Sequence, residues 1–133
     1  MEFAHTDMGG VMFFGRYLEL AHRAYEDLVC HGFGIEWQNW FDNPNWIAPI
    51  RALNVEYLSP LRGGSECQIQ VRVKKSGGSS FTHTYTFVSD GKDVAVVSLT
   101  SVFVDKKSFR KIPIPGPVRK ALEEYPLAET AAT

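Results

Sequence analysis

The hydrophobic and polar residues of this chain repeat with two different periods. Between Phe14 and Cys30, apolar residues return every three or four positions, the spacing that places side chains on one face of a helix. Gly32 and Gly34 follow shortly afterwards and are typical helix stop signals. The pattern therefore predicts one long amphipathic helix that ends near Cys30. Its apolar positions are Tyr17, Leu20, Ala21, Ala24, Tyr25 and Leu28.

From Ile50 onward the period changes to two, which predicts strands with alternating faces. The last of these runs, from Val94 to Val104, is apolar on both faces, as expected of a central strand. Ser76–Ser79 and Asp90–Gly91 have the composition of hairpin connections, so the last three strands should form an antiparallel meander. The alternating runs lie at residues 50–57, 67–73, 81–87 and 94–104.

Two stretches lack a clear period. Residues 35–49 mix tryptophans with Asn, Asp and prolines, which indicates an irregular loop with room for a short helical turn. Its aromatic side chains either line a pocket or pack the loop onto the body, and the sequence leaves both open. After a run of prolines, residues 118–125 are predicted to form a short terminal helix.

The predicted order is a short strand, one helix, a loop and four strands, in a single domain over residues 1–133. A lone amphipathic helix needs a surface that covers its apolar face. We therefore expect an α+β fold in which an antiparallel five-stranded sheet wraps around one long central helix. Such a sheet leaves an edge strand unpaired, so we also expect a homo-oligomer, either a dimer or a tetramer.

The composition narrows the class of protein. The chain has 133 residues, 44% of them hydrophobic and 22% charged, with a net charge of -1; this is typical of one globular domain and argues against a nucleic-acid-binding protein. Cys30 and Cys67 lack the spacing of metal ligands, and we predict neither a metal nor a cofactor. No basic and apolar leader opens the sequence, and no apolar run approaches the roughly 20 residues of a membrane span. We expect a cytoplasmic protein without a membrane partner.

The candidate chemistry lies just before the predicted helix. Asp7 is followed by Gly9 and Gly10, which allow a sharp turn and a close approach to a ligand. The unpaired N–H groups of the helix start then face the space near Asp7. A carboxylate opposite such donors suits thioester hydrolysis, because the donors stabilise the oxyanion that develops on the carbonyl oxygen. The alternative is that Thr6 and Asp7 only form a turn before the helix.

The segment from Phe3 to Tyr17 resembles the signature of the 4-hydroxybenzoyl-CoA thioesterase family, whose members have the hotdog fold. The signature positions are occupied by Thr6, Asp7, Gly10, Val11 and Phe14. Downstream, the stretch His22–Glu26 is similar to the HEAYE sequence of the branch that includes 1,4-dihydroxy-2-naphthoyl-CoA thioesterases. The resemblance extends to about Pro115 and so covers nearly the whole chain.

This resemblance implies an acyl-CoA thioesterase in which Asp7 is the catalytic carboxylate and the backbone N–H of Phe14 donates to the oxyanion. It also implies that the acyl group is bound by Gly10, Phe13, Tyr17 and His22. The substrate that it favours is 1,4-dihydroxy-2-naphthoyl-CoA, an intermediate of quinone biosynthesis. The alternatives are a short- or medium-chain acyl-CoA, an acyl-carrier-protein substrate, or a non-catalytic protein that binds acyl-CoA.

Some histidine positions need separate interpretation. His5 replaces the first carboxylate of the signature, and it either orients Asp7 or lies exposed in a loop. Phe14 stands where another branch carries a histidine, which leaves a histidine-assisted mechanism unsupported. His22 is either a ligand for a ring hydroxyl or a helix-flank histidine that its neighbours satisfy. His83, on an aromatic strand face, is predicted to be a satisfied core histidine rather than a ligand.

Overall fold

The computed structural model describes residues 14–59 and 66–125. The expected first strand and the predicted contributions of Asp7, Gly10 and Phe13 lie outside these residues. Within the described part, an antiparallel sheet and a helix packed on it form an α+β fold, as predicted.

The elements follow the predicted order. The run of helix, loop and four long strands is confirmed, and a short helix ends the described chain. None of the described helices has the length and apolar character needed to cross a membrane. The bounds are α1 (Phe14–Asp27), the π-helical turn η2 (Leu28–Gly32), α2 (Trp37–Phe41), β1 (Trp46–Ile47), β2 (Ile50–Tyr57), β3 (Gln68–Lys75), β4 (Ser80–Ser89), β5 (Lys92–Val102), β6 (Val104–Asp105) and α3 (Gly116–Glu124).

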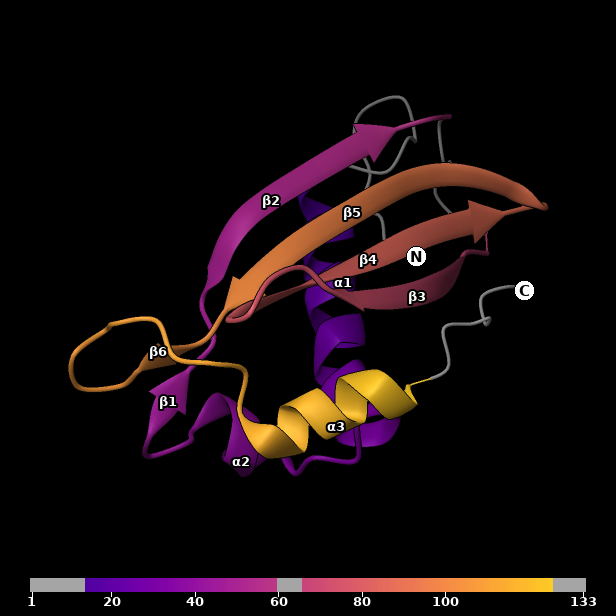
Figure 1. Cartoon of the computed structure of the whole chain (residues 1–133). Coiled ribbons are helices and arrows are strands. Elements are labelled where there is room, and N and C mark those ends of the chain that lie inside the picture. The colour runs from indigo at the N-terminus through magenta and orange to yellow at the C-terminus, as the bar shows by residue number, and fades with distance from the viewer. Residues whose placement is uncertain (1–13, 60–65, 126–133) are drawn as a thin grey trace.

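The main sheet has the strand order β2-β5-β4-β3, and every neighbouring pair is antiparallel (Figure 1). The meander of β3, β4 and β5 is therefore confirmed, and β5 lies between β4 and β2 as its apolar faces predicted. At the β4–β5 hairpin, Asp90 and Gly91 adopt φ angles of 53° and 74°. A two-residue turn of this hand needs positive φ at both positions, which explains the Asp-Gly pair.

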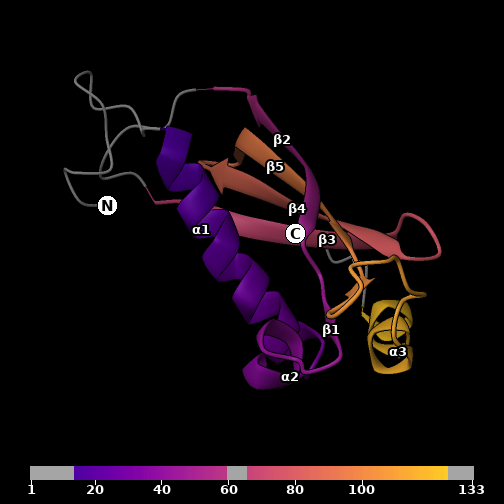
Figure 2. The same cartoon turned by 90° about the vertical axis from the view of Figure 1, so that its left-hand side faces the viewer.

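Helix α1 lies across one face of the sheet (Figure 2). It differs from the prediction in length, because the α-helical hydrogen bonding ends at Asp27 and the chain continues as a π-helical turn to Gly32. A Cβ atom at Gly32 would lie 2.9 Å from the Tyr125 ring, so glycine permits the end of α3 to approach this turn. The described sheet has four strands rather than five, and they cover one side of α1 rather than surrounding it.

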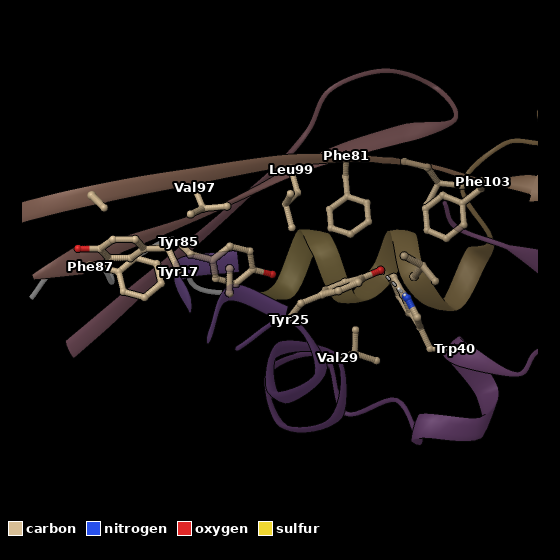
Figure 3. Close-up of a cluster of buried hydrophobic side chains, with 14 of the residues drawn as sticks. Tyr17, Tyr25, Val29, Trp40, Phe81, Tyr85, Phe87, Val97, Leu99 and Phe103 are labelled. Atoms are coloured by element: carbon tan, nitrogen blue, oxygen red, sulfur yellow. Dashed lines mark hydrogen bonds between the residues drawn. The ribbon is translucent and has the colours of Figure 1, made fainter. Parts of the chain in front are cut away.

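The core fills the layer between α1 and the sheet (Figure 3). Tyr17 and Tyr25 project from α1 and are nearly inaccessible to solvent. The opposite wall comes from β4, β5 and the residue after β5, with Phe81, Tyr85, Phe87, Val97, Leu99 and Phe103. Aromatic rings dominate this core and meet mostly edge to face, an arrangement that the ring quadrupole favours.

The segment predicted as an irregular loop holds the short helix α2 and strand β1, which pairs with β6. The question left open about its aromatic residues has a mixed answer. Trp40 is 3% exposed and belongs to the core, whereas Trp37 is 46% exposed. The Nε1–H of Trp40 donates a 2.8 Å hydrogen bond to the hydroxyl of Tyr25, so α2 is fixed to α1 from inside the core (Figure 3).

His83 is a satisfied core histidine, as predicted. Its side chain is fully buried, and Nδ1 and Nε2 lie 2.7 Å from the Tyr85 hydroxyl and 2.9 Å from the Ser101 hydroxyl. Burial lowers the pKa of His83 to about 3, because the charged imidazolium loses its hydration there. The residue is therefore neutral and holds β4 to β5.

Candidate active site

The amino end of α1 is the part of the described chain that can stabilise an oxyanion. Phe14 is the first described residue of α1, and the N–H groups at the start of a helix have no partner within it. They carry partial positive charge from the aligned peptide dipoles. The oxyanion role expected of the Phe14 backbone N–H stays a prediction, because Asp7 and the other residues before Phe14 lie outside the described part of the chain.

Tyr17, predicted to contact the acyl group, lies three residues further along α1 and is 1% exposed. Its ring meets Phe87 edge to face at 5.0 Å and Tyr57 at 5.6 Å between centroids. Burial, with smaller contributions from Cys67 and Tyr57, raises the pKa of Tyr17 to about 12. Tyr17 is thus a neutral phenol fixed between α1 and the sheet, an apolar wall near the helix start.

Cys67 lies close enough to Tyr17 to influence its titration. The thiol is half-buried and free, and burial raises its pKa. Since the thiolate is the reactive form of cysteine, this environment disfavours a nucleophilic role.

His22 lies on the flank of α1, with 62% of its side chain exposed. Its Nε2 is 3.4 Å from Oε2 of Glu26, one helical turn further on. The Nε1–H of Trp37, from α2, donates to the same carboxylate oxygen at 3.4 Å. We call His22, Glu26 and Trp37 the His22 cluster. His22 therefore has a partner on its own helix and still presents most of its side chain to solvent.

Tyr17 and His22 are therefore not side by side on one wall. Tyr17 faces the core, whereas His22 faces solvent on a different side of α1. Along the axis, at 1.5 Å per residue, His22 lies about 12 Å beyond Phe14.

The sequence reasoning missed the other members of the His22 cluster. The signal for Glu26 was present, because a histidine and a carboxylate four residues apart on a helix are neighbours. Trp37 gave no such signal, since its contact with Glu26 joins two different helices.

Arg16, also missed, lies in the first turn of α1. Its Nη1 donates to Oε1 of Glu19 at 2.8 Å, and its buried Nε has no hydrogen-bond partner among the described residues. A guanidinium edge of this kind suits an anionic group, so the helix start carries a positive side chain as well as its amides.

A cavity of about 210 Å³ opens between α1, α2 and the end of β1 with the two residues that follow it. Helix α1 contributes Tyr25 to the lining of this cavity, and Tyr25 lies about 16 Å beyond Phe14 along the helix axis. An acyl group whose carbonyl lies at the helix start reaches this cavity only if it is long. The cavity is lined by Tyr25, Trp40, Phe41, Ile47, Ala48 and Pro49.

Over residues 14–59 and 66–125, no three His, Cys, Asp or Glu side chains are grouped so that they could hold a metal ion.

Known proteins resemble this chain over most of its length. The profile of the Thioesterase-like superfamily matches residues 1–122. A 1,4-dihydroxy-2-naphthoyl-CoA hydrolase from Thermosynechococcus vestitus is 30% identical over 95% of this chain and 86% of its own length. The enzyme of the same name from Nostoc punctiforme is 29% identical over 92% and 82%.

Solved structures agree on the fold. The crystal structure of a 1,4-dihydroxy-2-naphthoyl-CoA thioesterase from Synechocystis superposes with a TM-score of 0.84 at 20% identity, covering 93% of this chain and 91% of that one. A gentisyl-coenzyme A thioesterase structure gives a TM-score of 0.78 at 21% identity, covering 92% and 95%. The architecture is therefore that of a hotdog thioesterase.

Proposed function

Because this chain belongs to the thioesterase-like superfamily, we propose that it hydrolyses an aromatic acyl-CoA, and that its substrate is 1,4-dihydroxy-2-naphthoyl-CoA. The observation that carries the proposal is the similarity, over nearly the whole chain, to hydrolases of that thioester. Their products, a free hydroxylated naphthoic acid and CoA, are then the products of this enzyme. Such a reaction belongs to quinone biosynthesis and takes place in the cytoplasm.

The reaction needs a nucleophile on one side of the thioester and hydrogen-bond donors on the other. We assign the nucleophile or general base to Asp7, which either attacks the carbonyl carbon or removes a proton from the attacking water. The backbone N–H of Phe14 stabilises the negative charge that develops on the carbonyl oxygen. The carbon–sulfur bond then breaks, the CoA thiolate leaves and is protonated, and water supplies the second carboxyl oxygen.

The acyl group lies along α1 in this proposal. Gly10 allows the backbone to approach the thioester, and Phe13 and Tyr17 give apolar surface near it. The neutral phenol of Tyr17 and its edge contact with Phe87 support a rigid wall at this point. His22 receives the far side of the ring system, about 12 Å along the helix from the oxyanion donor.

An Asp7→Asn variant tests the catalytic assignment. Removal of a catalytic carboxylate should lower kcat at least 100-fold, within the range typical of general acid–base groups, measured by the release of the CoA thiol. Asp27→Asn, an exposed carboxylate elsewhere on α1, is the matched control and should retain full activity. An Asp7→Asn enzyme that turns over as fast as the wild type would refute the assignment.

A second candidate substrate follows from the cavity at Tyr25. Because that cavity lies about 16 Å beyond Phe14 along the helix, it suits a medium-length linear acyl chain better than a compact ring. A panel of aromatic and aliphatic acyl-CoA thioesters decides between the two. A wide preference for aliphatic chains would exclude the naphthoyl substrate.

We also propose that the enzyme is a homo-oligomer assembled through the edge strand β2. The support is that β2 has a neighbour on one side, β5, among the described strands. Two of its large apolar side chains are about half exposed, Leu53 at 54% and Tyr57 at 53%. Large apolar residues on an open strand edge are typical of surfaces that pair with another chain.

A further inference from the structure

We propose that the turn after β6 docks the protein on an anionic lipid surface, with Phe109 inserted between the lipids and its basic neighbours against the headgroups. We call residues 105–111 the basic turn. It projects from the end of the molecule where β1, β6 and α3 lie, away from the start of α1 (Figure 1 and Figure 2). This surface lies outside the proposed active site, and its role does not depend on the proposed reaction.

The basic turn concentrates positive charge on a chain that is slightly acidic overall. Four of the 14 lysines and arginines lie between positions 106 and 111, although the net charge of the chain is -1. All four are exposed, and none of them forms an ion pair with a carboxylate of the described chain. The turn therefore presents a cluster of cations to solvent. They are Lys106, Lys107, Arg110 and Lys111.

Phe109 occupies a backbone position that usually belongs to glycine. Its φ angle is 59°, in the left-handed region that disfavours bulky side chains. Its N–H donates a 2.8 Å hydrogen bond to the carbonyl oxygen of Asp105, the pattern by which a helical turn ends in a left-handed residue. The fold of the turn thus requires this conformation, and a phenylalanine there lowers the stability of the turn.

The Phe109 ring is not compensated by packing within the described chain. Its side chain is 68% exposed, the highest value among the exposed large hydrophobic residues there. It belongs neither to the described core cluster nor to the partly buried residues packed against that cluster. A bulky apolar ring in a strained and exposed position indicates a contact outside the chain.

Asp105 holds the backbone that presents this ring. Its Oδ2 accepts hydrogen bonds from the backbone N–H groups of Lys107 and Ser108, at 3.0 and 2.8 Å. The N–H of Ser108, with smaller contributions from Lys107, lowers the pKa of the Asp105 carboxyl. Across the base of the turn, the Asp105 N–H donates to the carbonyl oxygen of Arg110 at 2.8 Å. Phe109 is therefore presented by a preorganised turn, which lowers the entropy cost of docking.

The size and shape of the basic turn favour a lipid bilayer over a protein partner. A single projecting turn offers much less area than the roughly 800 Å² per partner of a stable protein–protein interface. A bilayer needs no complementary pocket. Each lysine or arginine near an anionic surface strengthens binding roughly fivefold, and an aromatic ring adds apolar burial at the headgroup boundary.

Docking of this kind differs from spanning a membrane. The expectation that the protein has no membrane partner rested on the lack of a long apolar run and of a leader in the sequence. A surface contact through one aromatic side chain and several cations needs neither feature. The inference therefore replaces that expectation.

Sedimentation of the full chain with lipid vesicles tests the inference. One set of vesicles contains equal parts of phosphatidylglycerol and phosphatidylcholine, and the other contains phosphatidylcholine alone. The wild type should bind the anionic vesicles at least tenfold more tightly than the neutral ones. Binding should weaken as the salt concentration rises from about 0.1 to 1 M, because salt screens the charges. No binding to the anionic vesicles, or equal binding to both sets, would overturn the inference.

Variants separate the ring from the charges. Phe109→Gly should weaken binding to anionic vesicles at least fivefold and should keep or raise the urea midpoint of unfolding, because glycine suits the left-handed position. Lys107→Gln combined with Arg110→Gln should weaken binding roughly 25-fold. Lys74→Gln combined with Lys75→Gln removes the same charge from exposed positions of β3 and should change binding far less. An equal loss in this control would overturn the assignment to the basic turn.

Phe109→Trp reports on insertion directly. The indole emission from this position, after subtraction of the wild-type signal, should shift to shorter wavelength when anionic vesicles are added, because the ring leaves water. Vesicle binding without any shift would refute the insertion of Phe109.

Two other anionic partners would give different results. If the basic turn held the phosphates of CoA, the charge variant would raise the KM for an acyl-CoA thioester severalfold and would leave vesicle binding unchanged. If it bound an acidic protein, poly-L-glutamate would bind in a manner that depends on Phe109, and anionic vesicles would not. Either result overturns the inference. The vesicle measurements need no turnover, so they remain decisive even if the proposed thioesterase activity is absent.

Discussion

Leu53 on β2 and Leu99 on β5 are direct cross-strand partners, yet Leu99 is 7% exposed and Leu53 is 54% exposed. Paired residues in an antiparallel sheet project from the same face. Leu53 therefore points to the side of the sheet that carries the core, at a place that the described part of this chain leaves uncovered.

Leu53→Lys should dissociate the proposed oligomer. A lysine on an open strand edge disfavours pairing with another chain, while the exposed site costs the single chain little stability. Light scattering during size exclusion should show a lower mass. Phe109→Lys, at a side chain 68% exposed and outside β2, should leave the mass unchanged. The interface assignment fails if both variants keep the wild-type mass.

The fully buried His83 makes the free energy of unfolding depend on pH. Its pKa is about 3 in the folded protein against about 6.5 in the unfolded chain. Between these values the unfolded state binds one more proton than the folded state. The free energy of unfolding therefore rises with pH in this window and decreases as the pH falls from about 6.5 toward 3. His83 should contribute up to about 1.4 kcal/mol per pH unit in this window.

Urea titrations of the wild type and His83→Gln at several pH values measure this contribution. Glutamine remains polar but does not titrate, so the variant should show a shallower decline below pH 6.5. The same slope in both proteins would contradict the assigned role of His83.

The hydrogen bond from Trp40 to Tyr25 should contribute measurably to stability. Tyr25→Phe leaves the Trp40 Nε1–H without its acceptor in a buried site, which should cost about 1–3 kcal/mol. Trp37→Phe removes an indole that is 46% exposed and should change stability by less than about 0.5 kcal/mol. Thermal unfolding followed by circular dichroism compares the two, and equal losses would be inconsistent with this account.

The two glycine-containing hairpins differ in one respect that can be tested. Gly91 has a φ of +74°, whereas Gly78 lies outside the left-handed region, and a Cβ atom meets nothing within 4 Å at either position. Gly91→Ala should therefore destabilise the protein by about 1–2 kcal/mol, and Gly78→Ala should be neutral or slightly stabilising. Chemical denaturation measures the free energy of unfolding of both variants. Equal changes in the two would contradict the role assigned to the positive φ of Gly91.

Much of the fold could be predicted from local patterns. The periods around Tyr17 and Val71 separate helix from strand, and Asp90–Gly91 places a hairpin, because each depends on neighbouring residues alone. The prediction that His83 is paired in the core is also confirmed. The π-helical turn that ends at Gly32 was not predicted, and neither was the close approach of Tyr125, from the other end of the described chain, to that glycine.

The candidate site divides in the same way. The sequence by itself determined which residue types are available: a carboxylate at Asp7, a helix that begins near Phe14, and a histidine at position 22 with Glu26 one turn later. Only the tertiary structure decided that Trp37 contacts Glu26. It also decided that Leu53 stays exposed although it lies on the face of the sheet that carries the core. Periodicity reports which side of an element is apolar, whereas the partner that covers that side is chosen by packing between segments distant in the chain.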